Sequence, residues 1–278
     1  MAGKPLKTQA LERVGKDWSN ASGTREKNLG NIRRLCDRIE DKFGLEKLDN
    51  LKEKHLQAVF NDMRAEGMAS TTIAGYATAA RTVAESIGKA NIVPRDNESL
   101  GAGRAGERLC PKDVNHEGLQ TTRDAVAKEN LWHGLAADMS RDFGLRLEGS
   151  VSRFSVVQMD GQDYLRVTEK GNLTRHVPFE NQRQVETAKA VFAHIRERNQ
   201  TSLIPTGMTR KQGYDSLRMA WRDAGGTKAN NANFHAFRHA YVQERTGNNV
   251  ASMTREEKQA LVKAIGHGDT SKLRHYSN

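Results

Sequence analysis

Residues 235–238 of the chain read His-Ala-Phe-Arg, and this tetrapeptide is the first indication of the fold. His235 and Arg238 stand three positions apart, so a helix that begins here carries both side chains on one face. A proton-transfer group beside a cation suits an anionic reacting centre such as a phosphodiester. By itself, however, the tetrapeptide is more typical of a helix with a surface arginine and a half-buried histidine. Other motifs along the chain are therefore needed to identify a reactive site.

The spacing of His239, four positions after His235, is one that can hold a metal ion. The zinc-protease pattern needs glutamate directly after the first histidine, and Ala236 stands there. The two cysteines, Cys36 and Cys110, are too few for a disulfide framework or a cysteine metal site. The sequence therefore predicts no metal and no other cofactor.

The second half of the chain is predicted to combine helices with a small antiparallel sheet. Short runs of strand-forming residues are separated by the turn signals Asp160-Gly161 and Lys170-Gly171-Asn172, which predicts a three-stranded meander. Amphipathic helices are expected on both sides of it. The expected strands are 154–159, 164–167 and 175–179, and the expected helices are 118–142, 181–198, 209–223, 235–246 and 254–265.

The first ninety residues show only helical periodicity. Apolar residues recur at spacings of three and four over 24–43, 56–63 and 73–87, and residues 6–19 are expected to add a fourth helix. Residues 91–115 then break the pattern with prolines, glycines and scattered charges, as a linker does. Within them, residues 101–106 match G-x-G-x-x-G, but no strand precedes and no helix follows, so we expect a hinge and not a dinucleotide site.

The charge of the chain points to an anionic partner. Its 278 residues contain 44 Lys and Arg against 34 Asp and Glu, a net charge of +10, of which residues 1–110 carry +4 and the remainder +6. A long polyanion held by both halves, nucleic acid above all, fits this distribution. No apolar run approaches the ~18 residues of a membrane span, and no signal peptide is visible. We expect a cytoplasmic protein, associated with the nucleoid if the host is a bacterium.

Five short motifs along the chain form an ordered set. They are Gly-Leu-Arg after a helix, Lys-Gly-Asn in a hairpin, His-x-x-Arg at a helix start, Gly-His, and a tyrosine nine residues later: 144–146, 170–172, 235–238, 266–267 and Tyr276. This set resembles the tyrosine recombinase family, which includes the phage-type integrases and the Xer and Cre types. The resemblance covers nearly the whole chain.

The resemblance implies a mainly α-helical protein with a small antiparallel β-sheet, in two domains. Residues 1–95 are similar to the family's helical, SAM-like core-binding domain, which binds DNA. Residues 96–115 would be the linker. Residues 116–278 are similar to the mixed α/β catalytic domain of the tyrosine recombinases.

The resemblance also implies catalytic roles. Tyr276 would be the nucleophile that attacks a DNA phosphate and forms a covalent 3′-phosphotyrosine, with His235 assisting as a base. Arg146 and Arg238 would hold the non-bridging oxygens, on which charge builds in the transition state. The other tyrosines fit the role of nucleophile less well; they are Tyr76, Tyr164, Tyr214 and Tyr241.

Two further residues complete the implied site. Lys170 would protonate the leaving sugar oxygen, and His267 would donate a hydrogen bond to the phosphate. One departure concerns the acidic residue that the family usually carries three places after the first arginine. This chain has Gly149 there, and Glu148, one position earlier, is the candidate replacement.

The implied function is that of a site-specific recombinase or integrase of a mobile genetic element. Its partners would be double-stranded DNA, further copies of the chain in a tetramer on two DNA sites, and accessory DNA-bending proteins, with no membrane. Two alternatives stay open: a non-catalytic DNA-binding protein of the same fold, and a type IB topoisomerase-like enzyme. Because the family commonly continues into a C-terminal tail, a chain that stops two residues after Tyr276 is expected to be truncated or a short form.

Replacing Tyr276 with phenylalanine should abolish covalent trapping of DNA, because the phenol oxygen is the expected nucleophile. The measurement uses a suicide DNA substrate with a nick near the cleavage position and a denaturing gel. A wild-type chain that traps no adduct, or a Tyr276→Phe chain that still traps one, contradicts the assignment. Relaxation of a plasmid that lacks any target site would favour the topoisomerase.

Overall fold

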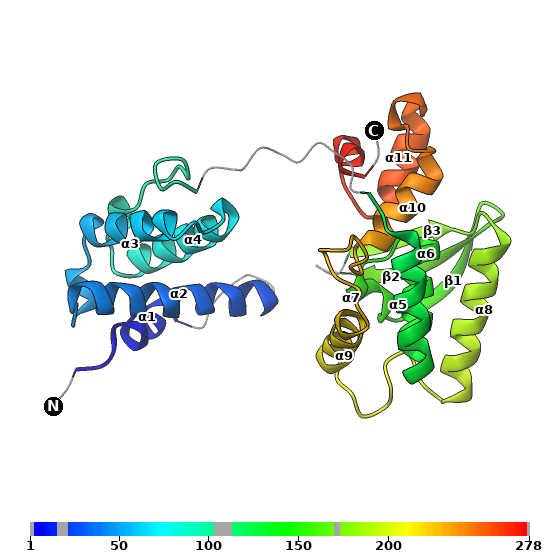
Figure 1. Cartoon of the computed structure of the whole chain (residues 1–278), viewed down its shortest axis with the longest axis horizontal. Helices are drawn as coiled ribbons and strands as arrows, with labels where there is room; N and C mark the ends of the chain where they lie inside the picture. The colour runs from blue at the N-terminus through cyan, green and yellow to red at the C-terminus, as the bar shows by residue number, and fades with distance from the viewer. Residues whose placement is uncertain (1–2, 16–21, 103–112, 170–172, 277–278) are drawn as a thin grey trace. The chain divides into compact units, whose positions relative to one another are not determined.

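The computed structural model describes residues 3–15, 22–102, 113–169 and 173–276. The chain divides into two compact units, Met1–Glu107 and Arg108–Asn278, each with its own core (Figure 1). The division falls inside the linker that we expected over residues 96–115. The G-x-G-x-x-G stretch lies outside the described residues from position 103 on, and so do Lys170 and the rest of its turn.

The regular elements of the first unit are all helices within its described residues. Figure 1 shows the long helix α2 lying alongside the other helices of the unit, and α2 packs against both α1 and α4. The expected helix over 6–19 is shorter in the structure, because Gly15 leaves the helix with φ +70°. The elements are α1 (Leu6–Val14), α2 (Ser22–Phe43), η1 (Leu48–Asn50), α3 (Glu53–Ala65), α4 (Ser70–Ser86) and η2 (Ala90–Ile92).

The second unit combines helices with one sheet. Its elements are α5 (His116–Glu129), α6 (Leu131–Phe143), α7 (Leu147–Ser150), β1 (Phe154–Met159), β2 (Gln162–Glu169), β3 (Leu173–Pro178), α8 (Gln182–Glu197), α9 (Arg210–Asp223), α10 (Ala236–Thr246), η4 (Val250–Ser252), α11 (Arg255–Ala264) and η5 (Thr270–His275). The helix α6 is central, since it packs against α5, α8 and α10, while α11 packs against β3 (Figure 1).

The sheet is antiparallel with the order β1-β2-β3, which confirms the predicted meander and the mainly helical fold class. Side chains alternate between its two faces. On β2 the inward positions are Leu165, Val167 and Glu169, and on β3 they are Arg175 and Val177. The register pairs Val167 with Arg175. The buried face of the sheet therefore carries two charged residues, Glu169 and Arg175, next to apolar ones.

One predicted helix, 118–142, is wrong as a single element. Asn130 has the extended backbone angles φ −145° and ψ 105°, and it separates α5 from α6. The break lets α5 turn back and pack against α6, where Ala127 and Gly134 come into close contact. Tertiary packing therefore overrides a helical periodicity that continues through the sequence.

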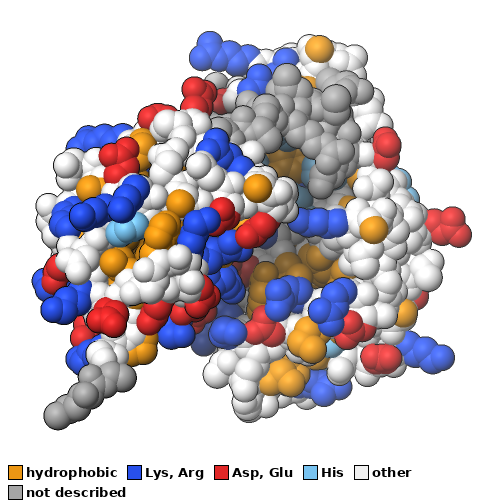
Figure 2. Space-filling model, turned by 60° about the vertical axis from the view of Figure 1, so that its left-hand side comes forward, with side chains coloured by type: hydrophobic (Ala, Val, Ile, Leu, Met, Phe, Trp, Pro, Cys, Tyr) orange, Lys and Arg blue, Asp and Glu red, His pale blue; other side chains and the backbone are white. Residues whose placement is uncertain are grey.

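The surface carries mixed charge. On the face shown in Figure 2, lysine and arginine side chains are spread among acidic ones, in keeping with a basic excess that both halves of the sequence share. Across the described ranges, no helix has the length and apolar character needed to cross a membrane.

Replacing Gly134 with alanine should lower the free energy of unfolding by about 1–3 kcal/mol, because the helices α5 and α6 touch there. A Cβ at position 134 would overlap the Ala127 Cβ and lie 3.2 Å from its Cα, and neither atom can move without shifting a helix. Urea unfolding followed by circular dichroism measures the change.

The matched control is Gly30→Ala in α2. A Cβ there would meet nothing closer than 4.0 Å, so this variant should gain up to about 1 kcal/mol from helix propensity. Equal stability of the two variants would contradict the close contact between α5 and α6.

Candidate active site

Five of the six residues singled out in the sequence lie together in the second unit, and the sixth, Lys170, lies outside the described residues. The rings of His235 and His267 lie 6.4 Å and 5.8 Å, centroid to centroid, from the Tyr276 ring. The Arg238 guanidinium interacts electrostatically with both the Tyr276 phenol and the Arg146 guanidinium. The five residues are Arg146, His235, Arg238, His267 and Tyr276.

Arg146 is positioned by the sharp end of α6. Gly144 ends that helix with φ +59°, and a Cβ at this position would come 2.6 Å from the Tyr241 ring, so both the backbone and the packing favour glycine. Leu145, 1% exposed, then anchors the chain in the core. The Arg146 side chain is one-third exposed, and its Nη1 donates a 2.7 Å hydrogen bond to Glu169.

The start of α10 is fixed by a cluster of aromatic rings. Trp221 lies 5.1 Å from Phe234 and 5.2 Å from Phe237, centroid to centroid, and its Nε1 donates to a backbone carbonyl in the loop before α10. His235, at the first position of the turn, is exposed, whereas Arg238 is fully buried. The same short helix thus presents one histidine outward and one arginine inward.

Tyr276 is held at both its backbone and its ring. It follows η5 and is 6% exposed. Its N–H donates to the carbonyl of Leu273, and its own carbonyl accepts a 3.0 Å bond from the Gln243 amide. The phenol oxygen lies 2.9 Å from His267 Nε2, and the His239 ring packs 4.7 Å from the Tyr276 ring, centroid to centroid.

Arg238 is the most unusual group in the site. Its side chain has no solvent exposure, and none of its three nitrogen atoms has a hydrogen-bond partner within the described part of the chain. Burial lowers the pKa of the guanidinium to about 10, and the neighbouring charges of Arg146 and Arg175 act in the same direction. A buried cation without a partner carries a large desolvation cost, so this position is suited to an anionic ligand.

The surroundings of His267 keep its imidazole neutral near pH 7. Burial, followed by the nearby guanidinium groups of Arg238, Arg146 and Arg175, lowers the pKa of its imidazole to about 4. A neutral imidazole nitrogen can accept the phenol proton of Tyr276 across the 2.9 Å contact. We expected His235 to assist the phenol, but in this structure the group hydrogen-bonded to the phenol is His267.

Three residues of the site were not predicted from the sequence. Glu169 and Arg175 form a buried ion pair of 2.7 Å beside Arg146. Their sequence signal was available in the alternation of β2 and β3, because Glu169 continues the buried series Leu165 and Val167. We missed it because we expected that strand to end at position 167.

The third missed residue is His239, whose spacing from His235 had suggested a metal ligand. In the structure its ring lies 5.3 Å from the His235 ring, centroid to centroid, and packs against the Tyr276 ring. No group of three or more His, Cys, Asp or Glu side chains that could hold a metal ion occurs among the residues that the structure describes.

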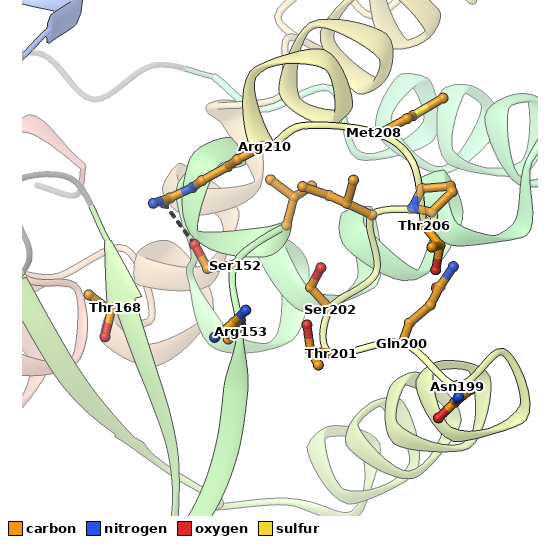
Figure 3. Close-up of a pocket in the computed structure, with 13 residues that line it drawn as sticks. Ser152, Arg153, Thr168, Asn199, Gln200, Thr201, Ser202, Thr206, Met208 and Arg210 are labelled. Atoms are coloured by element: carbon orange, nitrogen blue, oxygen red, sulfur yellow. Dashed lines mark hydrogen bonds between the residues drawn. The ribbon is translucent and has the colours of Figure 1, made fainter.

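A polar pocket flanks α7, the helix that begins directly after Arg146. Figure 3 shows hydroxyl and amide side chains around it, with Arg153 and Arg210 on the side of the sheet and α9. The Arg210 guanidinium donates a 3.0 Å bond to the Ser152 hydroxyl. The polar lining residues are Ser152, Arg153, Thr168, Asn199, Gln200, Thr201, Ser202, Thr206 and Arg210.

Comparison of the sequence finds no matching family model and no matching curated protein. Comparison of the structure finds similar folds. A XerH site-specific recombinase bound to palindromic difH substrate, in a post-cleavage complex, is 16% identical with a TM-score of 0.63, over 90% of this chain and 75% of that one.

Two integrase fragments are similar over nearly the whole of their solved chains. A lambda integrase, residues 75–356, solved as a dimer bound to a COC′ core site, is 13% identical with a TM-score of 0.63, over 96% of this chain and 94% of that one. The Tn1549 transposon integrase in complex with circular intermediate DNA is 16% identical with a TM-score of 0.54, over 99% and 95% of the two chains.

Lowering the pH from 7 to 5 should leave His267 neutral, because its pKa in the folded chain is about 4 and not the ordinary 6.5. Imidazole nitrogen shifts in the NMR spectrum of the DNA-free chain measure this titration, and His267→Gln identifies the signal. A midpoint of 6 or higher for His267 would contradict the buried, cation-flanked environment.

The same shift has a consequence for stability. Between pH 6.5 and 4 the unfolded chain binds a proton at His267 that the folded chain does not, so stability falls as the pH falls through this window. The His267→Gln variant should lose part of that pH dependence in urea unfolding.

Proposed function

The chain has the fold of the tyrosine recombinases, and we propose that it is a site-specific DNA recombinase that cleaves and rejoins DNA through a covalent 3′-phosphotyrosine at Tyr276. The observation that carries this proposal is the Arg238 guanidinium, fully buried and unpaired within the described residues, beside a tyrosine hydrogen-bonded to a histidine. A phosphodiester is the anion whose reaction uses this combination of groups.

Arginine suits the phosphate better than lysine would. Its planar fork matches two oxygens of a phosphate at once, and it stays charged when buried. Arg238 keeps a pKa of about 10 in spite of burial, so it is still a cation at neutral pH. We assign Arg146 and Arg238 to the non-bridging oxygens, where negative charge increases as the phosphorus becomes five-coordinate.

The chemistry is a transesterification. The Tyr276 oxygen attacks the phosphorus and its proton moves to Nε2 of His267, the group that lies within hydrogen-bond distance of the phenol. The Oη–P bond forms, the P–O bond to the 5′ oxygen of the leaving strand breaks, and Lys170 supplies the proton to that oxygen. One phosphodiester is exchanged for another, so a 5′ hydroxyl from a second strand can reverse the step and complete strand exchange.

In this scheme His235 donates a hydrogen bond to the phosphate. Its side chain is exposed at the start of α10, and its ring centroid lies 6.4 Å from the ring centroid of Tyr276. The imidazole therefore lies near the phenol ring. We therefore assign the base to His267 and the phosphate hydrogen bond to His235, the reverse of our expectation from the sequence, because His267 Nε2 lies 2.9 Å from the phenol oxygen.

The DNA backbone on either side of the scissile phosphate would lie over polar surface. The pocket beside α7 offers Arg153 and Arg210 together with several hydroxyl groups, which is the mixture that contacts sugar and phosphate oxygens (Figure 3). The helical first unit, with its own basic excess, would supply further phosphate contacts. Double-stranded DNA is therefore the proposed partner.

The structures of the similar proteins also include assemblies of several copies on DNA. They include recombinases solved on DNA as a dimer and, for lambda integrase, as a tetramer bound to a Holliday junction, with 14% identity and a TM-score of 0.59. We propose the same for this chain: a tetramer that joins two DNA sites and belongs to a mobile genetic element, with accessory DNA-bending proteins as further partners.

Replacing Arg238 with lysine should slow covalent adduct formation on the order of 10²-fold or more, because the charge stays but the two-oxygen contact is lost. The target is first selected from a randomised DNA pool bound by the wild-type chain and is then built as a nicked suicide duplex. Single-turnover adduct formation at saturating protein is measured on denaturing gels.

The matched control is Arg222→Lys, at an exposed arginine that pairs with its neighbour Asp223. This variant should keep the wild-type rate. If Arg238→Lys also keeps it, the guanidinium does not hold the phosphate and the proposed function loses its main support. A wild-type chain that binds the selected DNA but forms no adduct would instead favour the non-catalytic DNA-binding protein.

A further inference from the structure

We propose that Glu169 is a positioning residue of the reaction: its buried carboxylate anchors Arg146 and, through Arg175, the turn that carries His267. This inference rests on the proposed function and deepens it, because it names the group that holds the catalytic arginine in place. Neither Glu169 nor Arg175 belongs to any of the motifs that the sequence offered.

The Glu169 carboxylate is 1% exposed and accepts three hydrogen bonds. Its Oε2 accepts a 2.7 Å bond from Arg146 Nη1, and its Oε1 accepts a 3.1 Å bond from the Arg146 backbone N–H. Oε1 also accepts a 2.7 Å bond from Arg175 Nη2. One carboxylate thus fixes both the backbone and the side chain of Arg146, and a buried charge with these partners has little freedom to move.

The anchor leaves part of Arg146 available. Within the described residues, Nη1 is the only nitrogen of its side chain with a hydrogen-bond partner. The other guanidinium donors point to no protein acceptor in that part of the chain, and one-third of the side chain is exposed. Glu169 therefore holds the guanidinium from one side while its remaining donors can turn to a phosphate oxygen.

Gly149 explains why the carboxylate comes from the sheet. A Cβ at position 149 would overlap Glu169 Oε1 and lie 3.0 Å from its Cδ, so Glu169 fills the space that a side chain at 149 would enter. Position 149 is the place at which the tyrosine recombinases usually carry an acidic residue and this chain carries glycine. Glu148 does not replace it, because its carboxylate is partly exposed and lies 3.4 Å from Arg210.

Arg175 extends the anchor to the other end of the site. It is also 1% exposed, and its Nη1 donates to the carbonyl of Ala264, the last residue of α11. Two residues later, Gly266 has φ +64°, and a Cβ there would come 2.5 Å from Arg175 Cδ. The turn that aims His267 at Tyr276 is therefore packed directly on Arg175.

Glu169 also offsets part of the positive charge of the site. Arg146, Arg175 and Arg238 all act on one another, and Glu169 is the carboxylate that acts on both Arg175 and Arg238. Among the described residues, these three guanidinium groups and one carboxylate have a net charge of +2, and the proposed acid Lys170 lies outside this count. A phosphodiester carries one negative charge and gains a second as the tyrosine oxygen adds, so this balance complements the transition state.

The test compares Glu169→Gln with a variant that moves the carboxylate, Gly149→Asp combined with Glu169→Ala. Glutamine keeps the size and loses the charge, so the single-turnover rate constant for adduct formation should fall on the order of 10²-fold, as for a misplaced catalytic group. DNA affinity should stay within about threefold, since Glu169 does not contact DNA. The relocated carboxylate should recover at least tenfold of the rate lost in Glu169→Ala.

The rate constant separates positioning from stability. Loss of folded protein lowers the amplitude of the adduct burst and leaves its rate constant unchanged, whereas a displaced Arg146 lowers the rate constant. Glu148→Gln is the matched control and should react at the wild-type rate.

A Glu169→Gln chain that reacts at the wild-type rate overturns the proposal. So does a relocated variant that folds but reacts no faster than Glu169→Ala. If Glu169→Gln gives no adduct burst at all, the result of the variant with the relocated carboxylate is the test. A recovered burst in that variant supports the positioning role of Glu169, and no burst overturns it. A wild-type chain without adduct would overturn the proposed function itself, which is a different result from either.

Discussion

Three guanidinium groups lie close together in the second unit, and keeping them charged while they are wholly or partly buried is the constraint on which the site depends. Arg175 and Arg238 have almost no solvent exposure, and Arg146 keeps a third of its side chain exposed. Burying one such charge without compensation costs several kcal/mol, of the order of the net stability of a domain. The protein compensates two of the three with one carboxylate, and it leaves Arg238 without a hydrogen-bond partner in the part of the chain that the structure describes.

This arrangement needs rigid neighbours, and the fold provides them at the ends of its elements. The end of α6, the turn after α11 and the inner face of the sheet contribute Arg146, His267 and Arg175, and the start of α10 contributes both His235 and Arg238. Glycine in the left-handed region at positions 144 and 266 makes two of these ends sharp enough, and both glycines pack against a side chain of the site. The aromatic cluster around Trp221 holds the start of α10, and the buried Leu273 belongs to η5, which directly precedes Tyr276.

The same crowding of positive charge sets the proton chemistry. An imidazole among guanidinium groups stays neutral, and a neutral imidazole within hydrogen-bond distance of a phenol is a proton acceptor. The guanidinium groups therefore have two effects: they attract an anion, and they lower the proton affinity of the His267 imidazole. The first unit has its own helical core and its own share of the basic excess.

Sequence alone determined the local elements and the order of the motifs. Apolar spacing and turn residues placed nearly every helix and all three strands, because these signals depend on neighbours a few positions away. The ordered set of short motifs, through its resemblance to the tyrosine recombinases, marked Arg146, His235, Arg238, His267 and Tyr276. What the tertiary structure decided concerns residues far apart in the chain. The break at Asn130 follows from packing between two helices. Glu169 takes the space at Gly149 because strand register and helix position bring residues 20 positions apart together. His267 Nε2 lies 2.9 Å from the phenol oxygen because the turn after α11 packs on Arg175, and no local pattern encodes that contact.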